Sequence, residues 1–182
     1  ATRPRPAAVA LLLLAAAALV AGLVAAQLGR DGTNGAGANG DGDGGNGSTT
    51  VQLSAVADYD PDGDAVEHPE DVELATDGDP ATYWRTETYS SFSKEGVGIV
   101  LAAAEPVALS RLVVLSGEPG YRAKIQAGSS ESGPFEDVSS ERTVGERTAF
   151  PLDTGGEEYG FYVVWITDLA GRATVSEVRA RS

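Results

Sequence analysis

Few residues of this sequence have the types and spacing that enzymes use for catalysis. His68 is the single histidine among 182 residues, it stands in the polar stretch VEHPED, and cysteine is absent. A Ser-His-Asp triad would have to use His68, while thiol chemistry and Cys-ligated zinc are excluded. Acidic pairs such as Glu70-Asp71 and Glu157-Glu158 have the residue types of glycosidase acids, but 24 carboxylates after residue 50 make such pairs expected by chance. With no phosphate-binding loop and no nucleophile elbow, we expect no enzyme activity.

The polar run from Arg85 to Lys94, RTETYSSFSK, holds the main candidates for ligand contact. Tyr89 and Phe92 can offer aromatic faces for sugar stacking, and Arg85 adds hydrogen-bond donors. An equally good interpretation is an adaptable loop with one ring tucked beneath it. The run therefore predicts a possible carbohydrate site, and the sequence does not distinguish this from a loop without a binding role.

Two further groups of residues stand out by their neighbours. Tyr121 and Arg122 follow a glycine-containing turn at 117–120 and form a second candidate pair for ligand binding. Trp84 and Trp165 stand among apolar residues, and because an indole ring buries a large area we expect both in the core.

The charge balance argues against nucleic-acid partners. Residues 51–182 carry 10 basic and 24 acidic side chains, so their net charge is 10 − 24 = −14. A domain of that sign repels phosphate backbones and anionic headgroups, and the sequence shows no stripe of Lys and Arg. We expect neither nucleic-acid nor peripheral membrane binding. The Arg-dominated basic residues and abundant Ala, Gly, Asp and Val are typical of high-GC bacteria.

One apolar run near the N-terminus is long enough to span a membrane. Residues 7–26, AAVALLLLAAAALVAGLVAA, are 20 uninterrupted apolar residues, and about 1.5 Å of rise per residue gives roughly 30 Å. We expect a single transmembrane helix or signal anchor over 7–28, after a short cytoplasmic N-terminus of residues 1–6. Arg3 and Arg5 favour that orientation, which places the C-terminal domain outside the cytoplasm.

A cleaved signal peptide is the alternative, which would give a secreted protein. Val24 and Ala26 stand at the small-residue positions of a possible cleavage site, but secretory apolar regions usually run about 7 to 15 residues. Residues 29–50, GRDGTNGAGANGDGDGGNGSTT, lack any large apolar side chain and predict a flexible Gly/Asn/Asp linker.

From residue 51 the sequence consists of short β-rich runs separated by turn residues. We expect one domain over 51–182, with a helical turn near 69–76 and Phe161–Ile166 as a central strand covered on both faces. Strands are predicted near 51–57, 97–102, 107–115, 121–127, 134–138, 144–152, 159–167 and 173–180. Eight short strands predict an all-β sandwich.

The segment Ala75–Trp84, ATDGDPATYW, resembles the signature loop of the discoidin-like, or coagulation-factor type C, domains of the galactose-binding-like superfamily. LVVLS ending at Ser116, AKIQAGSSESGPFEDV at 123–138 and VVWITDLAGRATVSEVRA at 163–180 agree in order, so the similarity covers essentially all of 51–182. The sequence is also similar to the extracytoplasmic discoidin-like domains of bacterial membrane proteins. The resemblance implies an eight-stranded jelly-roll β-sandwich that recognises ligands with loops at one end, and it implies no activity.

The resemblance also implies a structural calcium ion. In many members of the family the DGDPxT loop and a Glu of the last strand enclose Ca²⁺, and the matching positions are Asp77, Asp79, Thr82 and Glu177. Calcium prefers six to eight oxygen ligands, which a tight glycine-containing loop can direct inward together. The alternative is an ordinary Asx-type turn in which Asp77 and Asp79 bond nearby backbone and Glu177 is solvated.

Two functions remain open at this point. The first is a membrane-anchored, non-catalytic module that binds a cell-envelope glycan or a related extracytoplasmic ligand. The second is a protein-interaction or sensory ectodomain of a larger membrane assembly.

Overall fold

The computed structural model describes residues 48–63 and 66–182. Residues 43–182 form one compact unit, which is distinct from residues 1–42. The predicted N-terminus, membrane helix and nearly all of the predicted linker lie outside the described residues. Within the described part of the chain, no helix has the length and apolar character needed to cross a membrane.

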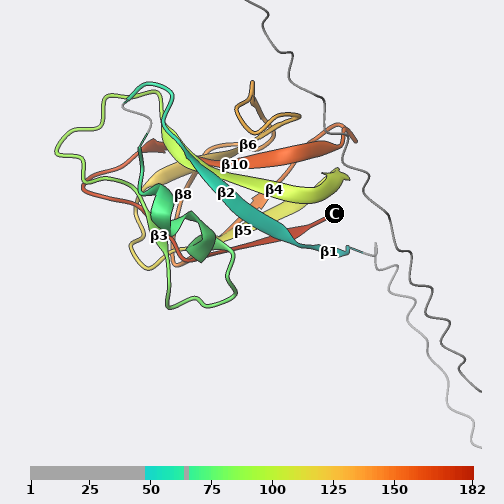
Figure 1. The fold of residues 1–182 in the computed structure, drawn as a ribbon, viewed down its shortest axis with the longest axis horizontal. Helices are drawn as coiled ribbons and strands as arrows, with labels where there is room; N and C mark the ends of the chain where they lie inside the picture. The colour runs from blue at the N-terminus through green and yellow to red at the C-terminus, as the bar shows by residue number, and fades with distance from the viewer. Residues whose placement is uncertain (1–47, 64–65) are drawn as a thin grey trace, which may run out of the picture. The chain divides into compact units, whose positions relative to one another are not determined.

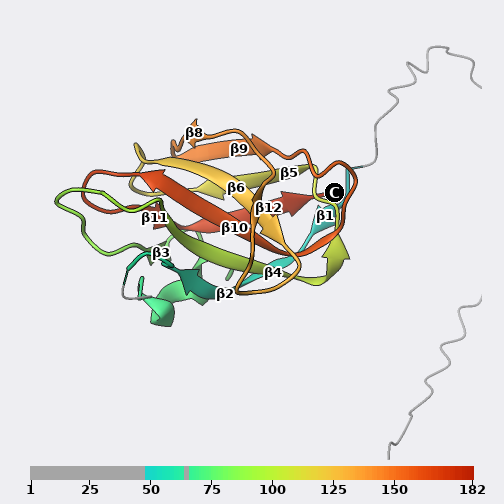
Figure 2. The same cartoon turned by 90° about the horizontal axis from the view of Figure 1, so that it is seen from above.

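The described residues fold into an all-β sandwich of two main sheets (Figure 1, Figure 2). The smaller sheet has the order β1 (Thr50–Val51), β12 (Glu177–Arg181), β5 (Arg111–Leu115) and β9 (Arg147–Pro151). The larger sheet has the order β2 (Leu53–Tyr59), β4 (Val97–Val107), β10 (Tyr159–Asp168), β6 (Arg122–Gly128) and β7 (Glu136–Asp137), and β8 (Arg142–Thr143) also pairs with β6. The short strands β3 (Trp84–Arg85) and β11 (Thr174–Val175) form a separate pair.

The predicted central strand is confirmed as β10. It pairs antiparallel with β4 on one side and with β6 on the other, so its backbone groups are bonded within the sheet. Its residues 162–166 are all buried, because alternate side chains face the sandwich interior and an outer apolar cluster. All eight predicted strand ranges overlap an observed strand, and the predicted all-β sandwich is confirmed.

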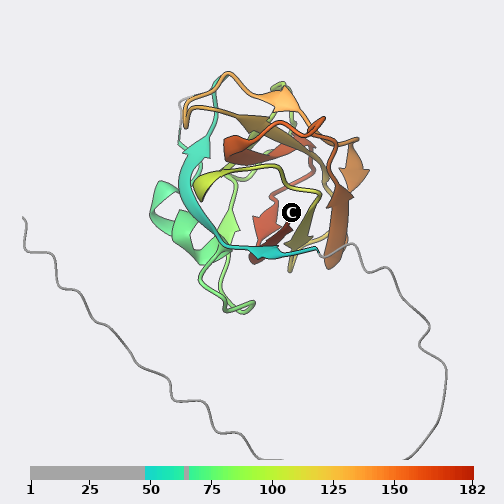
Figure 3. The same ribbon diagram turned by 90° about the vertical axis from the view of Figure 1, so that its right-hand side faces the viewer.

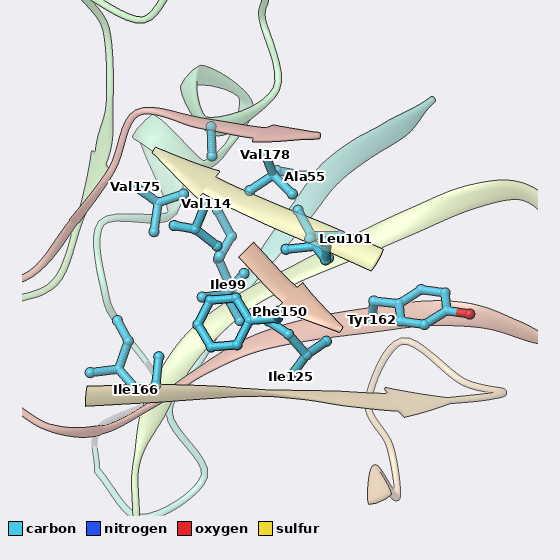
Figure 4. Close-up of a cluster of buried hydrophobic side chains, with 14 of the residues drawn as sticks. Ala55, Ile99, Leu101, Val114, Ile125, Phe150, Tyr162, Ile166, Val175 and Val178 are labelled. Carbon is cyan, nitrogen blue, oxygen red and sulfur yellow. The ribbon is translucent and has the colours of Figure 1, made fainter. Parts of the chain in front are cut away.

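The core lies between the two sheets (Figure 4). Ile99 of β4, Ile125 of β6 and Ile166 of β10 face Val114 of β5 and Phe150 of β9, and none of these five side chains is exposed. Full burial of each contributes about 1.5–3 kcal/mol relative to exposure. This interior fixes the positions of the strand ends that carry the candidate sites.

The two tryptophans are both buried, as predicted, but on different sides of the larger sheet. Trp84 belongs to the main core and is 0% exposed. Trp165 is 6% exposed and packs on the outer face with Val100 and Val163. Gly96 leaves space for its indole, because a Cβ at that position would lie 2.2 Å from the ring.

A short 3-10 helix, η1 (Pro69–Ala75), lies where the helical turn was predicted and makes about two turns. Pro69 begins it, and Val72 and Ala75 are buried against the sandwich. In Figure 3 the helix lies beside β2, and the hydroxyl of Thr76 accepts a hydrogen bond of 3.0 Å from the backbone N–H of Ala55. The DGDPAT loop that follows is thereby held next to the sandwich.

Candidate functional site

The DGDPAT loop is a compact network of side-chain and backbone hydrogen bonds. Asp77 Oδ1 accepts from the N–H of Asp79 at 2.8 Å, and Asp79 Oδ1 accepts from the N–H of Ala81 at 2.9 Å. The Thr82 hydroxyl contacts Asp77 Oδ2 and the carbonyl oxygen of Asp79, each at 2.8 Å. The Asp79 N–H and, next, the Thr82 hydroxyl lower the pKa of Asp77. This is the Asx-type turn that the sequence allowed as an alternative.

Glu177 is a buried carboxylate with an incomplete set of partners. Its residue is 6% exposed at the start of β12, and its Oε2 atom is buried with no hydrogen-bond partner among the described residues. Burial raises its pKa and the positive charge of Arg179 opposes that rise, while the nearby charge of Asp77 adds to it and the Gly78 N–H lowers the pKa. Glu177 therefore does not lie in bulk solvent, as the alternative interpretation required.

These observations fit a hard cation. The structure brings Glu177 next to Asp77 and Gly78, although almost a hundred residues separate them in sequence. An orphaned carboxylate oxygen beside a second carboxylate is expensive to bury unless a cation compensates it. Asp77, Asp79, Thr82 and Glu177 offer only oxygen atoms, which is the donor set that calcium prefers.

The predicted ligand loop, Arg85 to Lys94, is bound to the rest of the domain through its backbone. Tyr89 and Gly171 exchange two hydrogen bonds, of 2.6 and 3.1 Å, and the N–H of Thr86 donates to the carbonyl oxygen of Ala173 at 3.0 Å. Because these bonds fall at its start and its middle, the loop has a defined shape on the sandwich.

A buried network of ion pairs and hydrogen bonds connects the same loop to residues 60–67. Lys94 Nζ lies 2.7 Å from Asp60 Oδ2, 3.5 Å from Glu67 Oε1 and 2.9 Å from the Tyr89 hydroxyl, which itself donates to Glu67 Oε1. The side chains of Asp60 and Glu67 are 0% exposed. Glu67 Oε2 also accepts from the N–H of Glu87 at 2.6 Å. We refer to Asp60, Glu67, Tyr89 and Lys94 as the Lys94 network.

The network shifts the pKa values of its members. Burial alone would lower the pKa of Lys94, but its bonds to Asp60 and Tyr89 more than reverse this, so the pKa is raised. Burial, followed by the bond to Glu67, raises the pKa of Tyr89 to about 12. Both groups therefore keep their protons throughout the neutral range.

Tyr89 and Phe92 brace the loop and are only partly exposed. Their rings meet edge to face with centroids 5.1 Å apart, and both pack against the main core. This matches the interpretation with rings tucked beneath the loop better than a pair of open stacking faces. The exposed side chains of the loop are polar, and they are those of Glu87, Thr88, Ser90, Ser91 and Ser93.

The second candidate pair is separated by burial. Tyr121 is 3% exposed and its hydroxyl donates to the carbonyl oxygen of Thr174 at 2.8 Å, so its ring offers no face to a ligand. Arg122 is exposed and forms an ion pair with Glu141. The sequence expectation of a surface tyrosine here fails because the residue precedes β6 on the interior side of the sheet.

Sequence reasoning missed the Lys94 network. Its charged members lie up to 34 residues apart and each resembles a solvated surface residue in the sequence. One signal was available, because Lys94 is one of only two lysines and lies shortly before the buried start of strand β4. His68, in contrast, is half-buried and pairs with Glu70 at 3.1 Å at the start of η1.

The two-sheet architecture resembles the galactose-binding-like β-sandwich of discoidin-like domains. No family model matches the sequence. The structure resembles the module CpGH89CBM32-5 from Clostridium perfringens, in complex with GalNAc-β-1,3-galactose, with a TM-score of 0.55, 15% identity and coverage of 72% of this chain and 99% of that one.

Two further solved structures agree with that fold. The family 32 CBM of C. perfringens NanJ, in complex with galactose, matches with a TM-score of 0.55, 15% identity and coverage of 74% and 99% of the two chains. The F5/8 type C domain of a Bacteroides fragilis protein matches with a TM-score of 0.54, 13% identity and coverage of 74% and 96%. The chain spans only 14% of a family 89 glycoside hydrolase from C. perfringens, so that enzyme's activity is not transferred. The predicted resemblance is confirmed as a likeness of fold.

Proposed function

We propose that this protein is a non-catalytic carbohydrate-binding module that recognises a cell-envelope glycan outside the cytoplasm. The carrying observation is the Arg85–Lys94 loop, a polar surface held rigid by the Lys94 network. A loop fixed before binding loses little conformational entropy when a ligand arrives. The resemblance to two modules with bound galactose or GalNAc-β-1,3-galactose supports the ligand class.

Within this loop we assign ligand contact to Arg85 and to the exposed serines, and bracing to the two rings. Arg85 is half-buried in β3, and none of the hydrogen bonds or ion pairs of the described residues uses its guanidinium. Ser90 and Ser91 are exposed at the middle of the loop. Hydroxyl and guanidinium groups suit the hydroxyl-rich surface of a sugar.

The experiment is a binding screen of residues 43–182 against galactose, GalNAc-β-1,3-galactose and peptidoglycan fragments. We expect an Arg85→Ala, Ser91→Ala double variant to lose at least about tenfold in affinity for the sugar that binds, with an unchanged melting temperature. Ser129→Ala, an exposed serine on another loop, is the matched control. Absence of binding to every sugar would contradict the proposed function, and unchanged affinity of the double variant would contradict the proposed site.

We also propose that Asp77, Asp79, Thr82 and Glu177 hold a structural calcium ion. The unpartnered Oε2 atom of Glu177 supports this proposal, since a cation would complete its surroundings. Such an ion would join the loop after η1 to the beginning of β12. It would stabilise the fold without taking part in chemistry.

Finally, we propose that the domain is held at the cell surface by its N-terminal region. The support is in the sequence, where 20 apolar residues follow Arg3 and Arg5. The described part of the chain enters the smaller sheet at β1, an edge strand.

A further inference from the structure

The outer face of the smaller sheet carries a cluster of four arginines. In β12 the side chains of Val178 and Ala180 are buried in the core, so Arg179 and Arg181 project outward. Arg111 of β5 stands directly opposite Arg181, and Arg147 of β9 stands opposite Leu115 on the same face. We call Arg111, Arg147, Arg179 and Arg181 the arginine face.

These four arginines form no ion pair among the described residues, although the charge of Arg179 acts on the Glu177 carboxylate of the same strand. The basic residues that form ion pairs there are His68, Lys94, Arg122, Lys124 and Arg172. All four arginines of the arginine face are exposed residues. Two like charges placed directly opposite on neighbouring strands, as in Arg111 and Arg181, destabilise a sheet.

In the described part of the chain, the absence of ion pairs at the arginine face contrasts with the high acidic content of the domain. Residues 51–182 hold 24 acidic and 10 basic residues, and four of the ten basic ones gather on this single face. The sequence shows no basic stripe along the chain, but strand pairing creates one on the folded surface. At this face the four positive charges dominate over the distant acidic residues, because charges beyond a Debye length of about 8 Å are largely screened.

A hollow next to these arginines limits the size and shape of a ligand. It has a volume of about 440 Å³, and Arg147, Arg179 and Arg181 line it together with Thr50 and Gln52, while Asp77 and Glu177 line its other part. That volume lies in the range of small-ligand sites, of roughly 300–1,000 Å³. A discrete anionic unit can enter such a hollow, whereas a flat layer of lipid headgroups would contact only its rim.

We propose that the arginine face binds an anionic glycan, one whose sugars carry carboxylate or phosphate groups. A guanidinium offers a planar pair of donors that matches either group, and Thr50 and Gln52 add hydrogen-bonding groups for hydroxyls. The ligand class rests on the proposed carbohydrate function, but the surface is separate from the Arg85–Lys94 loop. The chain would then contact an acidic polysaccharide through two surfaces.

The test measures binding of residues 43–182, whose core and sheets are self-contained, to polygalacturonate and to a neutral galactan at millimolar calcium. The key variant is Arg179→Gln, Arg181→Gln. Its control is Arg122→Gln, Arg172→Gln, which removes the same charge from arginines paired with Glu141 and Glu118. We expect the key variant to weaken polygalacturonate binding at least about tenfold, the control less than about twofold, and galactan binding not to change.

Several outcomes would overturn the proposal. Equal losses in the two double variants would show an effect of net charge alone, and equal affinity for the neutral and the acidic polymer would show that charge is not recognised. Tighter binding to vesicles of anionic lipid than to polygalacturonate would assign the face to a membrane instead. Failure of the wild type to bind any glycan defeats the proposed function, whereas binding that depends on Arg85 but not on Arg179 and Arg181 defeats only this inference.

Discussion

Replacement of Lys94 by methionine tests the buried network on which the shape of the candidate loop depends. Methionine keeps most of the side-chain volume and removes the charge, which leaves the fully buried carboxylates of Asp60 and Glu67 without a cation. At 2.7 Å and an effective dielectric constant of about 20, the gross Lys94–Asp60 attraction is roughly 6 kcal/mol, much of it offset by desolvation.

We expect Lys94→Met to lower the free energy of unfolding by about 3 kcal/mol, the lower end of the range for a broken buried pair, because the Lys94 side chain is 19% exposed. That corresponds to a fall of about 10 °C in the melting temperature of residues 43–182. Thermal and urea unfolding followed by circular dichroism measure it. Lys124→Met is the matched control, since its ion pair with Asp137 is more exposed and is worth about 1 kcal/mol or less.

A second substitution and a pH series sharpen the test. Asp60→Asn in the Lys94→Met background should restore part of the loss, because one uncompensated charge disappears. The pKa values of Lys94 and Tyr89 are raised in the folded state, so the folded protein holds these protons more tightly than the unfolded chain. Their contribution is complete below about pH 10 and declines as the pH rises through the folded-state values. A Lys94→Met loss no larger than that of Lys124→Met would refute the reasoning.

Two further predictions concern the metal and the membrane. Calcium should raise the melting temperature of residues 43–182 by several degrees relative to chelator. The Glu177→Gln variant should lose that shift, and in chelator it should melt at a higher temperature than the wild type, because the amide removes a buried charge. Equal melting temperatures of the wild type in calcium and in chelator would exclude the site. The full chain should fractionate with membranes and lose its domain to protease added outside the cell, whereas recovery of a soluble protein that begins at Gln27 would indicate a cleaved signal peptide.

Much of the fold was predictable because local pattern and tertiary structure agree. Phe161–Ile166 is nearly continuously apolar, which indicates a strand covered on both faces, and β10 lies between β4 and β6. The 3-10 turn followed from Pro69 and the polar residues after it. Strand pairing was a different matter, because β1 and β12 meet from opposite ends of the domain and no local signal joins them.

The candidate sites were predictable only in part, for the same reason. The resemblance of ATDGDPATYW selected the loop and its distant partner Glu177, and the structure brings the two together. It did not indicate that the Tyr89 hydroxyl forms hydrogen bonds with Glu67 and Lys94. The local sequence of a tyrosine in a polar run is the same whether its ring is exposed or packed against the core. The burial of Tyr121 was also not predictable, because it depends on which side of the sheet the residue just before β6 faces.

The distribution of cations explains why net charge was a poor guide to this protein. One buried acidic cluster, Asp60 and Glu67, has its own cation in Lys94, and both Asp60 Oδ1 and Glu177 Oε2 are buried oxygens without a hydrogen-bond partner among the described residues. Arg179 stands two residues from Glu177 in the same strand, both line one hollow, and the charge of Arg179 opposes the rise in the pKa of Glu177. Because no ion pair joins Arg179 to Glu177, their mutual compensation is partial, and the proposed calcium ion at Glu177 and the proposed anionic glycan at the arginines would complete it.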